Sequence, residues 1–109
     1  MTTPLPEALA FTCPLDLDAI LVRLNAAGPW RWTLRDSDTY GDYLIARPTP
    51  IIGTKVRLFH QDGGRYVADL TYDDESLGHG LTHAQLVAVM RDQILPSLGA
   101  AAVTPTQAY

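Results

Sequence analysis

The sequence has one cysteine, no long apolar run and no excess of positive charge. Cys13 alone cannot form an intrachain disulfide, which excludes the disulfide-stapled framework of small secreted domains. No stretch approaches the roughly 20 apolar residues that a transmembrane helix needs. The N-terminal residues 1–7 contain two prolines and no basic residue, so they lack the pattern of a secretory signal peptide. We therefore expect a soluble protein of the reducing cytoplasm that does not associate with membranes.

Lysine and arginine together number 8 against 12 aspartates and glutamates, which gives a net charge of −4. This balance disfavours non-specific binding to nucleic acid duplexes, because such binding relies on excess positive charge. The charges are unevenly placed along the chain. Residues 30–65 hold six basic and four acidic residues, whereas the remaining residues hold two basic and eight acidic ones. A basic centre between acidic flanks is the main electrostatic feature of the sequence.

The 109 residues suffice for one domain, and 47% hydrophobic residues with 18% charged residues are typical of a packed core. We expect residues 1–8 to form a flexible N-terminus, residues 9–99 to form the domain, and residues 100–109 to form a flexible tail. The segment 9–12 is compatible with a short edge strand and with a loop that covers the core. The residues leave this choice open.

Two segments have the 3.6-residue periodicity of amphipathic helices. The first follows Asp16, a residue type favoured at the N-cap, and ends at Gly28, which can adopt the left-handed conformation after a helix. The second is predicted to begin with Thr82 as its N-cap. Gln85, three residues later, completes the capping-box pattern. Pro96 is expected to bend or end the last turn of this helix.

The middle of the chain has the two-residue alternation of strands, interrupted by turn residues. The turn at 62–64 contains two glycines and predicts a tight hairpin. The predicted strands are Trp30–Arg35, Asp42–Arg47, Lys55–Gln61 and Arg65–Tyr72. The sequence thus predicts an α+β domain of order α-β-β-β-β-α, a four-stranded antiparallel meander with both helices on one face. The predicted inner face of the other strands consists of Trp30, Trp32, Leu34, Val56, Leu58, Tyr66, Ala68 and Leu70. In the second strand, either Leu44 and Ala46 or Tyr43 and Ile45 face the core.

The face of the sheet opposite the helices is the first candidate for a functional surface. Its predicted partner-binding residues are Arg31, Arg35, Lys55, Arg57, Phe59 and Arg65. Cations interleaved with an aromatic ring can bind an acidic protein surface, and they also suit single-stranded nucleic acid. Our leading hypothesis is a small non-enzymatic interaction module, such as an adaptor, a chaperone-like or an inhibitor-like protein. It would present this face or an edge strand to a protein partner or to a second copy; nucleic acid binding is a third, less favoured hypothesis.

The alternative hypothesis is a small-ligand or metal-dependent enzyme site. Imidazoles and carboxylates, the groups used in metal and acid–base sites, are supplied by His60, His79, His83 and the acidic segment Asp73–Glu75. The spacing does not favour a metal clamp, because Gly80 interrupts the helix geometry that an i, i+4 histidine pair requires. We therefore predict no catalytic residue, metal or cofactor.

Three further patterns are assigned structural roles. The acidic turn at 36–42 resembles the start of a calcium loop, but Arg47 stands where the bidentate glutamate belongs, so we interpret it as a hairpin turn. Cys13 has no basic neighbour in the sequence that would activate its thiol. Trp30 and Trp32 lie on one face of a predicted strand, and we assign both to the core.

Overall fold

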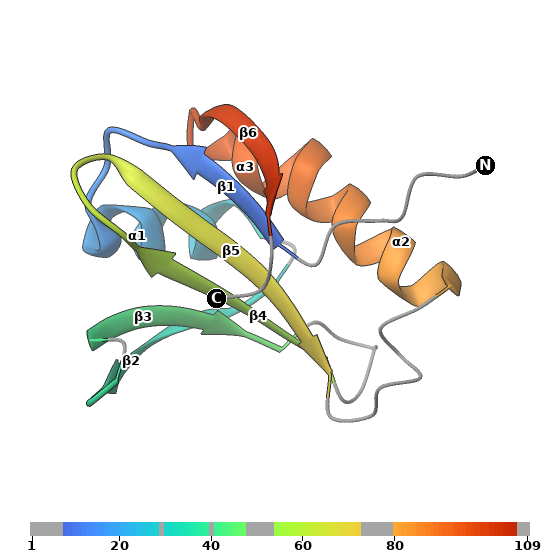
Figure 1. The fold of residues 1–109 in the computed structure, drawn as a ribbon, viewed down its shortest axis with the longest axis horizontal. Helices are drawn as coiled ribbons and strands as arrows, with labels where there is room; N and C mark the ends of the chain where they lie inside the picture. Colours follow the sequence, from blue (N-terminus) through green and yellow to red (C-terminus); the bar gives the residue numbers. More distant parts are fainter. Residues whose placement is uncertain (1–7, 29, 40, 48–53, 73–79, 107–109) are drawn as a thin grey trace.

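The computed structural model describes residues 8–28, 30–39, 41–47, 54–72 and 80–106. Within them, one sheet with the strand order β2-β3-β4-β5-β1-β6 packs against two helical segments (Figure 1). Every pair of neighbouring strands is antiparallel. The strands are β1 (Ala8–Thr12), β2 (Trp32–Ser37), β3 (Gly41–Ala46), β4 (Thr54–His60), β5 (Arg65–Tyr72) and β6 (Ala101–Thr106). The predicted α+β class is confirmed, but the predicted number of four strands is wrong, because β1 and β6 extend the meander beyond β5.

The first helix, α1 (Leu17–Ala27), has the two ends that the sequence predicts. The Asp16 carboxylate accepts a hydrogen bond from the backbone N–H of Ala19 at 2.8 Å. This bond satisfies one of the donors left open in the first turn. At the other end, Gly28 has φ 71° and its N–H donates to the Leu24 carbonyl. The positive φ explains why glycine stands there.

The second helical segment runs from Gly80 to Ser97 and begins earlier than predicted. It comprises α2 (Gly80–Val89), the π-helical turn η2 (Met90–Ile94) and α3 (Leu95–Ser97). Because α2 begins at Gly80, Thr82 is the third residue of the helix, so the predicted N-cap at Thr82 and its capping box are wrong.

The π-helical turn lies directly before the proline of the second helical segment. The Leu95 N–H donates to the carbonyl of Met90, five residues earlier. Pro96 has no N–H, and in a regular helix its ring would crowd a carbonyl of the preceding turn. The wider turn accommodates the ring, and the helical segment ends at Ser97, one residue past Pro96, as expected for a proline in the last turn.

A glycine turn after α3 sends the chain into β6, a strand that the sequence pattern does not predict. Gly99 has φ 68° and its N–H donates to Pro96, while the Ala100 N–H donates to Leu95. This pair of bonds is the Schellman arrangement, which ends a helix and reverses the chain. The following residues pair with β1, with Ala8 opposite Thr106. Residues 101–106, expected to belong to a tail, thus form an edge of the sheet, and the 9–12 segment is an interior strand.

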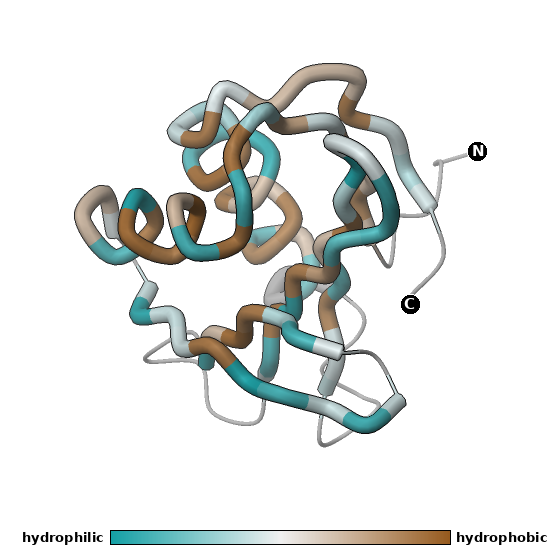
Figure 2. The backbone as a smooth tube through the Cα atoms, turned by 90° about the vertical axis from the view of Figure 1, so that its left-hand side faces the viewer, coloured by the Kyte–Doolittle hydropathy of each residue, from teal (hydrophilic) through white to brown (hydrophobic). Residues whose placement is uncertain are grey.

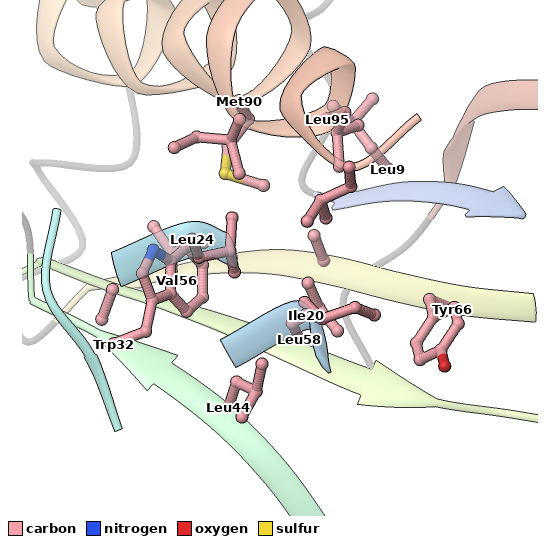
Figure 3. Packing of buried hydrophobic residues seen from close by; sticks show 14 of the residues in the cluster. Leu9, Ile20, Leu24, Trp32, Leu44, Val56, Leu58, Tyr66, Met90 and Leu95 are labelled. Atoms are coloured by element: carbon pink, nitrogen blue, oxygen red, sulfur yellow. The ribbon is translucent and has the colours of Figure 1, made fainter. Parts of the chain in front are cut away.

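The core lies between the sheet and the two helical segments, which pack on the same side of the sheet (Figures 1 and 2). Figure 3 shows Ile20 and Leu24 of α1 and Met90 of η2 directed toward the sheet. The parity of β3 is resolved, because Leu44 and Ala46 are buried in this cluster. The strands contribute the predicted inner-face residues Trp32, Val56, Leu58, Tyr66, Ala68 and Leu70, and Trp30, just before β2, joins the same cluster. Leu34, also predicted to face the core, is 43% exposed.

Candidate functional site

The centre of the sheet face opposite the helices is buried. Phe59 is 1% exposed, and Val67 beside it is also buried. The Arg57 guanidinium donates two hydrogen bonds to Asp69, from Nε to Oδ1 at 3.0 Å and from Nη2 to Oδ2 at 2.7 Å. It also lies 5.0 Å from the centre of the Phe59 ring. Of the predicted partner-binding residues, Arg57 and Phe59 are therefore engaged within the protein, and Lys55 is half-buried.

Two aromatic rings of this face are packed on each other. The rings of Tyr43 and Phe59 stack with centroids 5.1 Å apart. A base of single-stranded nucleic acid would need an exposed aromatic face on which to stack. The burial of Phe59 removes its ring from that use.

Arg65, at the start of β5, folds back onto the β4–β5 hairpin turn. Its guanidinium donates to both carboxylate oxygens of Asp62, at 2.9 and 3.0 Å. Hydrogen bonding to Asp62 raises the pKa of Arg65, and the same bond lowers the pKa of Asp62. Both side chains are exposed, so this pair is a surface ion pair in the turn.

The two remaining predicted residues, Arg31 and Arg35, lie at the edge of the sheet. Arg31 immediately precedes β2 and Arg35 lies within it, and both are exposed. Among the described residues neither makes an ion pair. Four of the six predicted residues are thus partly buried or paired, and the other two, Arg31 and Arg35, lie just before β2 and within it.

Strand β2 is an edge strand whose outer backbone groups are partly unpaired. The side-chain amide of Asn25 donates to the Trp32 carbonyl at 3.0 Å and accepts from the Trp32 N–H at 2.7 Å. The backbone groups of Trp32 therefore point away from β3. In an antiparallel ladder this direction alternates along the strand, so the N–H and C=O groups of Leu34 and Asp36 also point outward.

The hydrogen bonding of the β4–β5 hairpin supports this assignment. The Gln61 N–H donates to the Arg65 carbonyl at 2.9 Å, which places the odd-numbered residues of β4 toward β5. The backbone groups of the even-numbered residues of β4 then point toward β3, and those of the odd-numbered residues of β3 point toward β2. It follows that the backbone groups of the even-numbered residues of β2 point to the open edge. Within the described part of the chain, no hydrogen bond engages the outward groups of Leu34 or Asp36.

The opposite edge, β6, differs from β2 in ways that hinder pairing with another strand. Pro105 lacks an N–H donor, and the pairing of β6 with β1 shifts register after Ala10. Ala102, within this irregularity, has φ 53°. Prolines and bulges are devices that protect sheet edges. Residues 33–36 of β2 contain neither device, and all four are exposed.

A cleft of about 610 Å³ adjoins the β2 edge on the helix side of the sheet. Leu34 forms part of its rim, and Asp42, the cross-strand partner of Asp36, also lines it. Asp16 and Asp18 at the start of α1 contribute two more carboxylates. No lysine or arginine occurs among the described residues that line it. The cleft is therefore acidic beside an exposed apolar side chain.

Sequence reasoning does not find this cleft. Asp16 and Asp18 are interpreted as helix-start residues, and Asp36 and Asp42 as turn residues. Capping and turn formation each explain these carboxylates without any contact between the two segments. Only the packing of α1 across the sheet brings Asp42 into one cleft with Asp16 and Asp18. The acidic residues of the hairpin and of the helix start could have predicted an acidic cleft only if the position of α1 on the sheet had been known.

The two described histidines of the alternative enzyme site, His60 and His83, do not come together. His60, at the end of β4, contacts the Gly63 carbonyl through Nε2 at 2.7 Å. His83, in α2, is 5% exposed, and its Nδ1 contacts the hydroxyl of Tyr72. Tyr72 lies opposite Thr54, at the other end of β4 from His60. His79 and Asp73–Glu75 lie outside the described residues.

The Tyr72 hydroxyl retains its proton over a wide pH range. Burial raises the pKa of Tyr72 to about 12. The Tyr72 hydroxyl and Nδ1 of His83 form a hydrogen bond, and this bond ties β5 to α2. Over the described residues, no three His, Cys, Asp or Glu side chains are grouped so that they could hold a metal ion.

The residues that the sequence assigns to structural roles are internal. Cys13 is buried, with its thiol 3.4 Å from the Leu98 carbonyl. Trp30 and Trp32 are core residues as predicted, with rings 6.2 Å apart. The indole N–H of Trp32 is buried and has no hydrogen-bond partner within the described part of the chain.

Among the helices that the structure describes, none is long and apolar enough to cross a membrane. Comparison of the chain with protein-family models, with curated proteins and with solved structures found no match.

Proposed function

We propose that this protein is a non-enzymatic interaction module that binds an extended segment of a partner protein at the open edge of β2. The segment would add a seventh strand to the sheet, as in other cases of recognition by strand addition. The observation that carries the proposal is the outward backbone of Leu34 and Asp36, which no other described residue hydrogen-bonds, on an edge without a proline or a bulge.

The exposed residues of this edge supply the other requirements of such a site. Main-chain hydrogen bonds give affinity in strand addition, while alternate side chains give specificity. Leu34 offers apolar surface on the helix side, and Arg35 offers a charge on the other side. Asn25 already occupies the groups of Trp32, which limits the added strand to the stretch beyond that residue.

The charges of β2 favour a different protein over a second copy of this chain. Two copies paired around Arg35 would place two guanidinium groups opposite each other, and pairing around Asp36 would oppose two carboxylates. Like charges directly opposite are destabilising. Pairing around Leu34 avoids this, but a longer ladder then needs the backbone of Trp32, which Asn25 holds. A second copy would therefore gain only one hydrogen-bonded pair of residues.

A substitution that removes one edge donor tests the proposal. Because the Leu34 N–H points outward, Leu34→Pro deletes it without breaking the β2–β3 ladder. Leu34→Ala is the matched control, since it removes the same side chain and keeps the donor. We expect peptides selected from a random displayed library to bind the wild type and Leu34→Ala, and to lose binding to Leu34→Pro.

Amide hydrogen exchange then locates the binding. Bound peptide should slow the exchange of the Leu34 and Asp36 amides, whereas the amides of β6 should be unchanged. The proposal is overturned if selected peptides bind Leu34→Pro as well as they bind the control, or if protection maps elsewhere. An unchanged thermal unfolding midpoint would show that Leu34→Pro is folded.

A further inference from the structure

We infer that the bound segment is an antiparallel strand with a basic, an acidic and an apolar residue opposite Asp36, Arg35 and Leu34, in that order along the segment. The inference rests on the proposed function and adds the chemistry of the partner. It follows from the side of the sheet on which each of these three side chains lies, and from the charges around them.

Side chains of the added strand would alternate between the two faces of the sheet, as those of β2 do. Leu34 lines the acidic cleft, so the helix side carries the even-numbered residues of β2. Residues of the segment opposite Leu34 and Asp36 would lie on that side, and the residue between them would lie on the side of Arg35. Directly opposite side chains are about 5 Å apart at Cβ, so each pair interacts.

The position opposite Leu34 calls for an apolar residue. Leu34 is 43% exposed at the rim of the cleft, although its neighbours on the same face, Trp32 and Leu44, are buried. An apolar side chain placed against Leu34 would remove this surface from water, which is favourable in proportion to the area covered.

The position opposite Asp36 calls for a basic residue. Asp36 pairs across the sheet with Asp42, and Asp42 faces the same cleft as Asp16 and Asp18. Against these three carboxylates, the described lining residues offer one imidazole, that of His60, and no lysine or arginine. A lysine or arginine of the segment has a long side chain that can follow the apolar rim and bring its charge to them. An acidic residue there would be repelled.

The position opposite Arg35 calls for an acidic residue. Arg35 is exposed, and within the described residues it has no carboxylate partner. Its cross-strand neighbour in β3 is Tyr43, which stacks on Phe59 and supplies no charge. Because the backbone groups of Arg35 point toward β3, Arg35 and the residue opposite it would form a non-hydrogen-bonded pair, in which the side chains are closest. A glutamate or aspartate at that position would lie directly opposite the Arg35 guanidinium.

Two synthetic peptides of about nine residues test the inference, a length typical of one strand. They share flanking threonines and differ only in the centre, which is Lys-Glu-Val in the first and Glu-Lys-Val in the second. Their composition and net charge are identical. We expect the first to bind about 3- to 10-fold more tightly by fluorescence anisotropy at low salt, because two favourable pairs become two like-charge pairs in the second. The difference should shrink as salt is added.

Reversing the charges on the protein should reverse the preference. The double variant Arg35→Glu/Asp36→Lys is expected to bind the Glu-Lys-Val peptide more tightly than the Lys-Glu-Val peptide. Both substituted residues are exposed, so thermal unfolding should be close to that of the wild type. This swap separates recognition at the edge from a general attraction between charges.

The outcomes separate the inference from the proposed function. Equal binding of both peptides, lost in Leu34→Pro, would overturn the charge order and leave strand addition intact. Absence of binding by either peptide, while library peptides still require the Leu34 N–H, would also overturn the charge order. Failure of library peptides to depend on that N–H would overturn the proposed function itself. A tighter Glu-Lys-Val complex with the wild type would indicate a parallel or shifted strand and would contradict the inference.

Discussion

Asn25 of α1 holds both backbone groups of Trp32, donating to its carbonyl at 3.0 Å and accepting from its N–H at 2.7 Å. A side-chain amide thus takes the place that a neighbouring strand would occupy at this end of β2. The contact fixes the helix against the sheet edge and defines where the open part of the edge begins. Asn25 is a boundary residue for the proposed binding surface.

Replacing Asn25 should weaken this attachment and lengthen the open edge. Asn25→Ala removes two hydrogen bonds, and we expect it to lower the free energy of unfolding by about 1–2 kcal/mol. The Trp32 amide should exchange faster with solvent. Urea unfolding and hydrogen exchange measure the two effects. Val22→Ala is the control on the same helix, since Val22 is 71% exposed; equal losses in the two variants would contradict the role of the amide.

The Arg57–Asp69 ion pair should behave as a buried pair. The Asp69 side chain is 0% exposed and its carboxylate accepts two bonds from Arg57. Arg57→Met removes the cation and leaves the carboxylate buried, so we expect a loss of about 3 kcal/mol or more. The double variant Arg57→Met/Asp69→Leu should lose less, because it removes the buried carboxylate together with the guanidinium that donates two hydrogen bonds to it.

The exposed Arg65–Asp62 pair provides the comparison for this test. Arg65→Met should leave the unfolding midpoint close to that of the wild type, because exposed ion pairs contribute little. Chemical denaturation of the variants measures these differences. If Arg57→Met lowers the free energy of unfolding less than the double variant does, the pair does not behave as a buried ion pair.

The sequence predicts the elements whose signals are local. Asp16 and Gly28 mark the ends of α1 through their own capping chemistry, and alternation identifies the four strands of the meander. The pairing of Arg57 with Asp69 could also have been predicted from the sequence. The two-glycine turn at 62–64 sets the register of the hairpin, and that register places both residues opposite each other on the outer face.

The elements that the sequence does not predict depend on contacts between distant residues. β6 contains Pro105 and has no alternation of buried and exposed residues, so it has no local strand signal. It forms because β1 presents a free edge about a hundred residues earlier in the chain, where Ala8 faces Thr106. The identity of the open edge likewise depends on strand order, which made β2 the edge and brought Asp42 close to α1.

The raised pKa of Tyr72 should appear in the stability at high pH. An unfolded tyrosine has a pKa near 10, whereas burial raises the pKa of Tyr72 to about 12 in the folded protein. The neutral phenol therefore favours the folded state, and this contribution is complete below pH 10 and is lost as the pH rises toward 12. We expect the unfolding midpoint to fall across that range.

Tyr72→Phe separates this contribution from that of the other buried phenol. Burial also raises the pKa of Tyr66, with the charges of Cys13 and Asp16 adding to the effect, so part of the decline should persist in the variant. The variant also loses the bond to His83 and should be about 1 kcal/mol less stable at neutral pH. Thermal unfolding followed at several pH values measures both changes; an identical pH profile for wild type and variant would contradict the assignment to Tyr72.

The turn at Gly99 should control the attachment of β6. Gly99 has φ 68°, and a Cβ there would contact nothing within 4 Å, so the only cost of a side chain is the backbone conformation. We expect Gly99→Ala to lower stability by about 1 kcal/mol and Gly99→Asn to lower it less, because asparagine tolerates this conformation better. If β6 is held through this turn, the amides of Ala8 and Ala10 in β1 should exchange faster in Gly99→Asn than in the wild type, and faster still in Gly99→Ala. Equal exchange in all three proteins would mean that the β1–β6 ladder forms independently of the turn.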